Sequence, residues 1–227
     1  MNTACVEVVA AVIERPDGSF LLAQRPRGKV YEGYWEFPGG KVAPGEQLSV
    51  ALQRELHEEL GIDVGIAHPW IVQTYTYPHA TVRLNFFRVR AGKGEPHGKE
   101  DQRLAWQHAS AVDVAPLLPA NAPVLRALQL PFEYALTHAG EIGAEQQLAC
   151  LDQRLAEGLR LIQVREEGTP APDLERFAEA VIALARPHGA RVLINSDIEL
   201  ALRLRADGVH LAAAQLLRTE QRPALAW

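Results

Sequence analysis

The 227-residue sequence predicts an α/β protein made of two consecutive units. Two observations predict the first unit. Short apolar runs flank turn signals, and residues 48–60 are rich in helix formers and contain no Gly or Pro. A third observation predicts the second unit, because strand-like and helix-like segments alternate regularly after Leu130-Pro131. We therefore expect a mixed α/β/α sandwich over residues 1–130 and a parallel βα arrangement over residues 131–227.

Each element expected in the first unit has a local reason. The turn signal PDGS at residues 16–19 predicts a hairpin between two apolar strands, and Pro78 predicts a turn between two further strands. Gly61 follows the helical segment as a stop signal. The expected strands are residues 6–13, 20–24, 71–77 and 81–90, and the expected helical segments are residues 48–60, 111–118 and 122–128.

A dense group of glutamates lies in the loop before the first helix and on the helix itself. Residues 40–62 have the pattern G-x5-E-x7-R-E-L-x-E-E-L-G-I. Helical geometry places Glu55, Glu58 and Glu59 on one face within about one turn. Like charges at this spacing repel each other, so stability alone does not explain them. Hard oxygen ligands of this kind suit a magnesium ion that also contacts phosphates.

Other residues of the same pattern can support such a site. Leu52, Leu56 and Leu60 form an apolar stripe that can anchor the helix to a core. Glu46, in the loop, and Arg54 can brace each other or the metal-bound carboxylates. The sequence therefore predicts a metal-dependent enzyme.

The whole pattern resembles a Nudix box, the signature of hydrolases that cleave a nucleoside diphosphate linked to another group. The fixed positions of the family pattern are all present, at Gly40, Glu46, Arg54, Glu55, Leu56, Glu58, Glu59, Gly61 and Ile62. The resemblance implies a Nudix α/β/α sandwich and a Mg²⁺-dependent enzyme, with Mn²⁺ as an alternative ion. It is specific for the family and uninformative about the substrate.

Residues outside the box resemble the MutT branch, which hydrolyses oxidised nucleotides. WEFPGG at residues 35–40 is similar to the branch's entry to the box, and Arg25 ends a strand where a basic residue can meet phosphate. Glu100 stands where MutT-like enzymes carry a further metal-binding or base glutamate, and Asn121 where they read the oxidised guanine edge with an amide. The substrate-binding residues implied are Arg25, Glu36, Phe37, Pro38, Gly39, Lys41 and Asn121.

Two positions depart from that branch. Lys29-Val30 stands where some MutT proteins have a base-contacting histidine, and Ala80 follows residues 77–79 where an arginine occurs in others. These departures concern base specificity rather than hydrolysis.

The resemblance also implies a mechanism. The implied ligands of two or more Mg²⁺ ions are the Gly39 carbonyl, Glu55, Glu58, Glu59 and Glu100. Such ions neutralise pyrophosphate oxygens and lower the pKa of a bound water that attacks phosphorus. By analogy, Glu55 or Glu100 takes the proton of that water, and Arg54 completes the catalytic set. The expected reaction converts 8-oxo-dGTP to 8-oxo-dGMP and pyrophosphate, which cleans the nucleotide pool and avoids mutation.

The second unit resembles another family. Its expected strands are residues 134–137, 161–165, 192–195 and 208–211, and its expected helices are residues 145–157, 173–185 and 198–205. QVRE at residues 163–166, IN at 194–195 and ADGVHL at 206–211 resemble the thiamine phosphate synthase and TenI family, an eight-fold βα barrel. Such a barrel needs about 200 residues or more, so about half a barrel is expected over residues 131–227.

The resemblance places Gln163, Arg165 and Asn195 at strand ends, where such barrels bind a phosphate or a pyrimidine. Two positions argue against thiamine phosphate synthesis. Glu167 replaces the family's lysine, and Ser196 replaces its metal-binding aspartate.

Composition restricts the partners. A net charge of −5 argues against a non-specific nucleic-acid or membrane-surface binder, which leaves a nucleotide as the expected partner. Cys5 and Cys150 are expected to be reduced core residues, and together with the lack of a signal peptide or membrane span they suggest a cytoplasmic protein. The sequence does not specify an oligomeric state.

Three hypotheses remain from different classes. The first is the MutT-like diphosphatase. The second is a Nudix hydrolase acting on another nucleoside diphosphate derivative or on a thiamine-pathway pyrophosphate, as the attached unit suggests. The third is a non-catalytic nucleotide sensor, against which the complete box argues because a binding module does not need the full ligand set.

Overall fold

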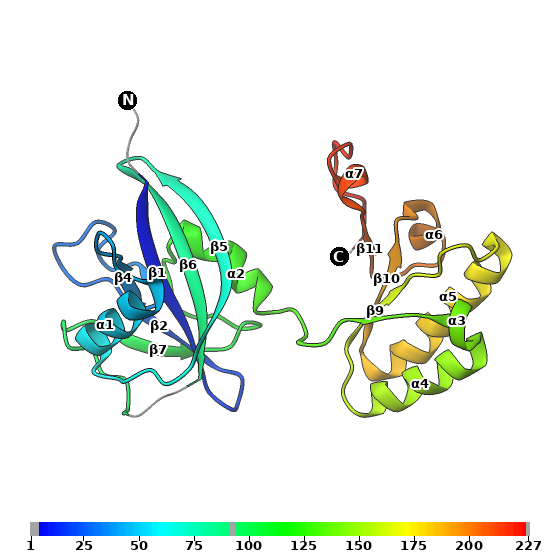
Figure 1. Cartoon of the computed structure of the whole chain (residues 1–227), viewed down its shortest axis with the longest axis horizontal. Coiled ribbons are helices and arrows are strands. Elements are labelled where there is room, and N and C mark those ends of the chain that lie inside the picture. The colour runs from blue at the N-terminus through cyan, green and yellow to red at the C-terminus, as the bar shows by residue number, and fades with distance from the viewer. Residues whose placement is uncertain (1–4, 91–93, 226–227) are drawn as a thin grey trace. The chain divides into compact units, whose positions relative to one another are not determined.

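The computed structural model describes residues 5–90 and 94–225. The chain divides into two compact units, Met1–Leu130 and Pro131–Trp227, each with its own sheet (Figure 1).

The first unit is built on a mixed sheet. Its elements are β1 (Val6–Glu14), β2 (Phe20–Gln24), β3 (Trp35–Glu36), β4 (Gly39–Lys41), α1 (Leu48–Leu60), β5 (Ala67–Tyr77), β6 (Ala80–Arg90), β7 (Leu104–Gln107), the 3-10 turn η1 (Pro119–Asn121) and α2 (Ala122–Ala127). The strand path is β3-β2-β1-β6-β5, with β4 paired to β1 and β7 paired to β2. Because β1 and β6 are parallel while the other pairs are antiparallel, the predicted mixed sheet is confirmed.

The central strand β1 shows why the sheet is covered on both faces. Successive side chains of a strand point to opposite faces, and both sets are buried here. Val9, Ala11 and Ile13 share a core with Leu52, Leu56 and Leu60 of α1, whereas Ala10 and Val12 share one with Val124 of α2. Figure 1 shows the two helices on opposite sides of the sheet, as the predicted sandwich requires.

The region before α2 is not helical, and the prediction for residues 111–118 is wrong. Trp35 donates its N–H to the Pro116 carbonyl across 2.8 Å, and Leu118 donates to the Trp35 carbonyl across 3.0 Å. This pairing with β3 holds the segment extended, and a proline inside it cannot continue a helix. The short strand β7 was not expected from the sequence.

The second unit is a parallel sheet with helices. Its elements are β8 (Ala135–Leu136), α3 (Ala139–Ile142), α4 (Ala144–Ala156), β9 (Leu161–Val164), α5 (Ala171–Ala185), η2 (Arg186–His188), β10 (Arg191–Asn195), α6 (Ile198–Arg203), β11 (Gly208–His210) and α7 (Ala213–Leu216). The strand order is β11-β10-β9-β8 and each pair is parallel. The four expected strands and three expected helices are therefore present.

The helices of this unit pack on the sheet through one apolar core. Ile162 and Val164 of β9 meet Leu151 and Leu155 of α4 in that core. The expectation that the cysteines are core residues is wrong, because Cys5 and Cys150 are both free and exposed. Cys150 precedes Leu151 on α4 and so lies off the buried stripe of that helix.

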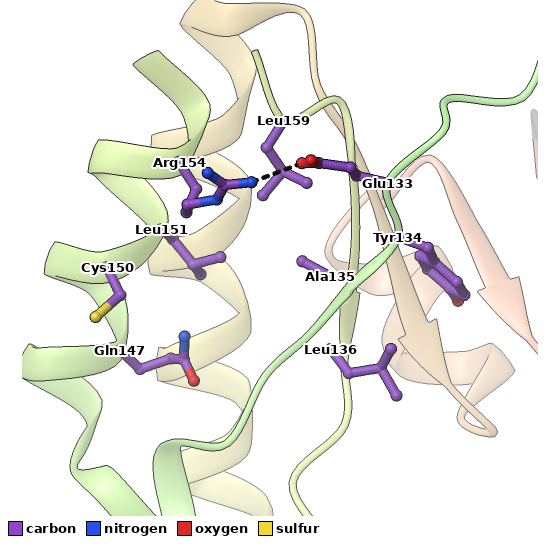
Figure 2. Close-up of a pocket in the computed structure, with 9 residues that line it drawn as sticks. All are labelled: Glu133, Tyr134, Ala135, Leu136, Gln147, Cys150, Leu151, Arg154 and Leu159. Carbon is purple, nitrogen blue, oxygen red and sulfur yellow. Dashed lines mark hydrogen bonds and ion pairs between the residues drawn. The ribbon is translucent and has the colours of Figure 1, made fainter. Parts of the chain in front are cut away.

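A pocket of about 280 Å³ lies between α4 and the chain around β8 (Figure 2). Leu151 and Leu159 supply apolar wall, and Arg154 forms a 2.8 Å ion pair with Glu133. The strand-end residues Gln163, Arg165 and Asn195 do not line it. Across the part of the chain that the structure describes, no helix is long and apolar enough to cross a membrane.

Candidate active site

Helix α1 is fixed in rotation by its buried side. Leu52, Leu56 and Leu60 have no exposed surface, which confirms the predicted stripe. Gly61 ends the helix in the left-handed conformation, with φ at 65°, and donates its N–H to the His57 carbonyl across 3.1 Å. The glutamate-bearing side of α1 is therefore held against β4.

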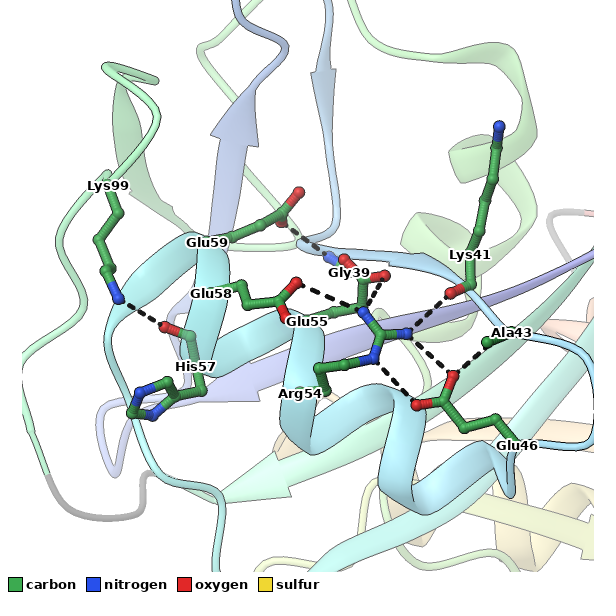
Figure 3. Close-up of polar contacts among 10 residues, drawn as sticks. All are labelled: Gly39, Lys41, Ala43, Glu46, Arg54, Glu55, His57, Glu58, Glu59 and Lys99. Carbon is green, nitrogen blue, oxygen red and sulfur yellow. Dashed lines mark hydrogen bonds and ion pairs between the residues drawn. The ribbon is translucent and has the colours of Figure 1, made fainter.

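Arg54 connects three of the box glutamates (Figure 3). Its Nε and Nη2 atoms each donate to the Glu46 carboxylate across 2.9 Å, and its Nη1 donates to Glu55 across 2.8 Å and to Glu58 across 3.4 Å. Nη2 also donates to the Lys41 carbonyl across 3.1 Å. The hydrogen bonds from Arg54 lower the pKa of Glu46 to about 2. The structure thus brings Glu46 and Arg54 together, with Glu55 as their neighbour.

The two glycines at β4 leave space for neighbouring atoms. A Cβ atom on Gly40 would lie 2.2 Å from the Glu55 carboxylate, and one on Gly39 would lie 2.1 Å from the Val9 carbonyl oxygen. Gly39 also has φ at 145°, a conformation that L side chains rarely adopt, and its N–H donates to Glu59 across 3.3 Å. Gly40 therefore leaves space for the Glu55 carboxylate, whereas Gly39 allows β4 to lie close to the backbone of β1.

Glu59 is a partly buried acid of the box helix. Burial raises the pKa of its carboxyl group to about 7, while the Gly39 N–H acts in the opposite direction. Glu36 raises this pKa further and Lys29 lowers it. A carboxyl group in such surroundings is stabilised as an anion when a positive charge binds beside it.

The loop that carries Glu100 is attached to the last turn of α1. Backbone and side-chain donors of the loop meet carbonyl groups in the last turn of the helix, where helices leave carbonyls without internal partners. These pairs are His97 N–H to Leu60 (3.1 Å), Lys99 N–H to Glu59 (3.0 Å), Lys99 Nζ to His57 (3.2 Å) and Gln102 Nε2 to Glu59 (3.1 Å). Gln102 also accepts the Glu100 N–H across 2.7 Å. Glu100 is thus placed near the box by residues that the sequence did not single out.

Two ion pairs involve Lys29, in the loop at residues 26–34, and Arg25, which immediately precedes that loop. Lys29 Nζ lies 2.5 Å from Glu100, and Arg25 Nη1 lies 2.6 and 2.7 Å from the two oxygens of Glu36. Burial raises the pKa of Glu36, and the Arg25 guanidinium lowers it. In each pair, a basic side chain from the loop at residues 26–34, or from the residue before it, lies beside an acid.

The remaining predicted substrate residues differ in accessibility. Asn121 is only 4% exposed, and its Nδ2 donates to the Trp35 carbonyl across 3.4 Å. The Phe37 ring is buried between Phe20 and Phe86, with centroid distances of 5.7 Å to each. Its side chain therefore serves the core, as that of the buried Pro38 does, whereas the Lys41 side chain is exposed.

An aromatic cluster beside these residues was missed from the sequence. The Tyr31 ring lies 5.1 Å from Tyr34, 5.3 Å from Tyr77 and 5.9 Å from His79. Burial raises the pKa of Tyr77 to about 12. The alternation in YTYPH at residues 75–79 could have indicated one shared face, but the partner loop is distant in sequence.

The donor set agrees with the chemistry of a hard divalent cation. Glu55 lies in the space that Gly40 leaves open, and Glu59 is a partly buried acid beside the Gly39 amide. Within residues 5–90 and 94–225, no three acidic, histidine or cysteine side chains already form a metal-sized cluster. The Arg54 Nη1 atom donates to both Glu55 and Glu58.

In the second unit, the strand ends bring two of the three expected side chains together, Gln163 and Asn195, and add His210. Gln163 Nε2 donates to Asn195 Oδ1 across 3.0 Å, and His210 Nδ1 lies 3.3 Å from the same oxygen. Arg165 instead pairs with Glu167 across 2.7 Å. Glu167, which replaces the family's lysine, therefore forms an ion pair with Arg165, the arginine expected to bind phosphate.

Comparisons with known proteins agree with this geometry. The NUDIX domain family matches residues 9–127, and the thiamine monophosphate synthase family matches residues 133–226. A CTP pyrophosphohydrolase of Escherichia coli K12 is 41% identical over 122 residues, which are 54% of this chain and 90% of that protein. An 8-oxo-dGTP diphosphatase of Haemophilus influenzae is 36% identical over 128 residues, which are 56% of this chain and 94% of that protein.

A solved structure supports the fold of the first unit. The MutT NUDIX hydrolase from Burkholderia pseudomallei is 30% identical with a TM-score of 0.50, and the match covers 54% of this chain and 97% of that one. The second unit is similar to thiamine phosphate synthases, as its strand motifs predicted. Since the NUDIX match covers more than half of the sequence, the chain belongs to the Nudix family of pyrophosphohydrolases.

Proposed function

We propose that residues 1–130 hydrolyse nucleoside triphosphates to monophosphates and pyrophosphate with Mg²⁺, and that 8-oxo-dGTP of the cytoplasmic nucleotide pool is the preferred substrate. One observation carries this proposal. The short segment 35–39 contacts Asn121 at its first residue, Trp35, and Glu59 at its last, Gly39. A nucleotide lying along this segment has its base near an amide and its phosphates near the carboxylates of α1.

The proposed roles follow from the positions of the side chains. Glu55, Glu58, Glu59, Glu100 and the Gly39 carbonyl would hold Mg²⁺, which when bound supplies charge neutralisation and an acidified water. Arg54 orients Glu55 and Glu58 through its hydrogen bonds and keeps Glu46 ionised. Arg25 stays paired with Glu36 at the base of the loop at residues 26–34 and fixes the direction of that loop.

Two glutamates are candidates for the general base. Glu55 contacts Arg54 and Glu100 contacts Lys29, so each candidate lies beside a cation. The base must be ionised to accept a proton from the attacking water. In pH–rate profiles, replacement of the true base by Gln should remove the acidic limb, whereas replacement of the other carboxylate should lower the rate and leave that limb in place.

A substrate panel tests the proposal. The full chain is incubated with Mg²⁺ and 8-oxo-dGTP, dGTP, CTP, dCTP or thiamine pyrophosphate, and the products are separated by anion exchange. We expect the highest kcat/KM for 8-oxo-dGTP, with monophosphate and pyrophosphate formed in equal amounts. Hydrolysis without pyrophosphate release, or no hydrolysis of any nucleotide, contradicts the proposal.

A second candidate is hydrolysis of a pyrimidine nucleotide. The relative named as a CTP pyrophosphohydrolase is 41% identical to this chain. Lys29 and Ala80 also depart from MutT positions that contact the base. In the same panel, a higher kcat/KM for CTP or dCTP than for 8-oxo-dGTP would favour this candidate.

A further inference from the structure

The ion pair between Lys29 and Glu100 joins two loops that are distant in sequence. Lys29 lies in the loop at residues 26–34, and Glu100 lies in the loop attached to the end of α1. Both side chains are almost half exposed, at 46% and 44%. An ion pair with this exposure contributes little to stability and is screened by water. Either side chain can therefore leave the pair for another partner with a small loss of free energy.

The neighbouring pair of Arg25 and Glu36 differs in each of these respects. A guanidinium nitrogen contacts both carboxylate oxygens, and the side chains are only 23% and 26% exposed. The Arg25 Nε also donates to the Val30 carbonyl across 2.6 Å. Arg25 is therefore part of the loop's framework, whereas Lys29 is the cation that can move.

The loop around Lys29 is held in place independently of its ion pair. Gly33 donates its N–H to the Arg25 carbonyl across 3.0 Å, which closes the base of the loop. Tyr31 has a positive φ of 62°, which is unfavourable for a side chain of this size, yet its ring packs against Tyr77 and His79. Release of Lys29 from Glu100 should therefore move a side chain and leave the loop in position.

Charge gives Lys29 a second partner. Glu100 is a proposed ligand of a divalent cation. When such a cation binds this carboxylate, it neutralises the negative charge that otherwise attracts Lys29. The polyphosphate of a nucleotide at the same site is itself a strong acceptor for an ammonium group. A flexible lysine on a fixed loop can bind one anion and then the other.

We propose that Lys29 is an exchangeable counter-ion, which pairs with Glu100 until a divalent cation binds that carboxylate and then binds the polyphosphate of the nucleotide. The inference rests on the proposed function of this site. It predicts opposite effects of Lys29 on two affinities, since the lysine competes with the metal and assists the substrate.

The test uses the full chain with Lys29→Gln, and Arg27→Gln as a matched control. Arg27 is an exposed cation of the same loop, so its replacement changes the net charge equally. With Mn²⁺ alone in calorimetry, Lys29→Gln should bind the ion about two- to fivefold more tightly. With nucleotide and saturating Mg²⁺, its KM should rise about tenfold and its kcat should change by less than about twofold. Lys29→Arg keeps the charge and should restore KM.

Each outcome separates the two proposals. A wild-type chain that binds no Mn²⁺ and hydrolyses no nucleotide contradicts the proposed function itself. A wild-type chain that does both, with unchanged Mn²⁺ affinity or unchanged KM in Lys29→Gln, contradicts the exchange alone. Equal changes of Mn²⁺ affinity and KM in Arg27→Gln would also contradict the exchange. They would show that any positive charge of the loop has the same effect.

Discussion

The carboxylate of Glu55 fills the space that a Cβ atom on Gly40 would occupy, 2.2 Å from that atom's position. The preceding glycine has a different restriction, because a Cβ atom on Gly39 would meet the backbone of Val9. The two adjacent glycines therefore have different roles: Gly40 leaves room for the Glu55 side chain, and Gly39 leaves room for the backbone of the sheet.

This contrast predicts opposite outcomes for two neighbouring alanine variants. Gly40→Ala should displace Glu55, a flexible side chain, and should reduce Mg²⁺-dependent hydrolysis by about 100-fold while unfolding free energy changes by less than about 1 kcal/mol. Gly39→Ala should destabilise the fold by about 3 kcal/mol or more, because φ is positive and the clash is with backbone. Urea unfolding and steady-state rates measure both effects, and equal destabilisation of the two variants would contradict this account.

Replacing the acids proposed to bind the metal should greatly reduce activity without loss of the fold. We expect Glu58→Gln or Glu59→Gln to reduce pyrophosphate release by about 100-fold or more, because each removes a charged oxygen ligand. The control is Glu145→Gln, which changes an exposed acid in the first turn of α4. Chelation of divalent ions should bring the wild type to the level of the variants, and Mg²⁺ should restore it. If pyrophosphate release is unchanged in both variants, the proposal that these acids take part in catalysis is wrong.

Arg54 should act through the side chains that it positions. Arg54→Lys keeps the charge but cannot donate to Glu46 through two nitrogens and to Glu55 through a third. We expect kcat to fall about 10- to 100-fold, with a change of less than about 1 kcal/mol in unfolding free energy. If Arg54→Lys retains full activity, charge alone is sufficient and the bracing geometry is unimportant.

The pKa of Glu59 predicts a pH dependence of stability in metal-free protein. Burial raises the folded-state pKa to about 7 from the ordinary value of 4.5. The folded protein therefore binds the proton more tightly, and the stabilisation is complete below 4.5 and is lost as pH rises through 7. Thermal melts with chelator should show a melting temperature that falls between these values. In Glu59→Gln, the fall of the melting temperature between these pH values should disappear. If the fall persists, another titrating group causes it.

Mg²⁺ should oppose that trend. A proton and a divalent cation compete for the same carboxylates, so the ion should raise the melting temperature more at pH 8 than at pH 5.5. Differential scanning fluorimetry with and without Mg²⁺ measures the difference. Equal shifts at the two pH values would mean that the ion binds away from Glu59.

Local patterns were sufficient for the elements whose hydrophobic periodicity and end signals agree. The helix α1 begins and ends at the expected residues because an apolar stripe and Gly61 indicate the same boundaries. Residues 111–118 were predicted wrongly because pairing with Trp35, distant in sequence, overrides local helix preference. The extent of β5 was underestimated, since its first residues from Ala67 are largely exposed and lack an apolar pattern.

The site shows the same division. The contacts of Arg54 with Glu46 and Glu55 arise within one loop and one helix, where spacing is informative. Gln102 and the pair of Lys29 with Glu100 depend on how separate loops meet, and one sequence does not specify that distance. Chemistry carried by a single element was therefore predictable, and chemistry shared between loops was not.

The loop after β6 ends the last turn of α1 through hydrogen bonds to the carbonyls of Glu59 and Leu60. Helix ends are the segments that fray first in the native state. When this turn opens, Glu59 loses its helical position and Glu100 loses its anchor in the same event. Amide exchange at His97 and Lys99 should thus report how often the site is assembled, and substitutions that stabilise this helix end should increase the fraction of molecules ready to bind substrate.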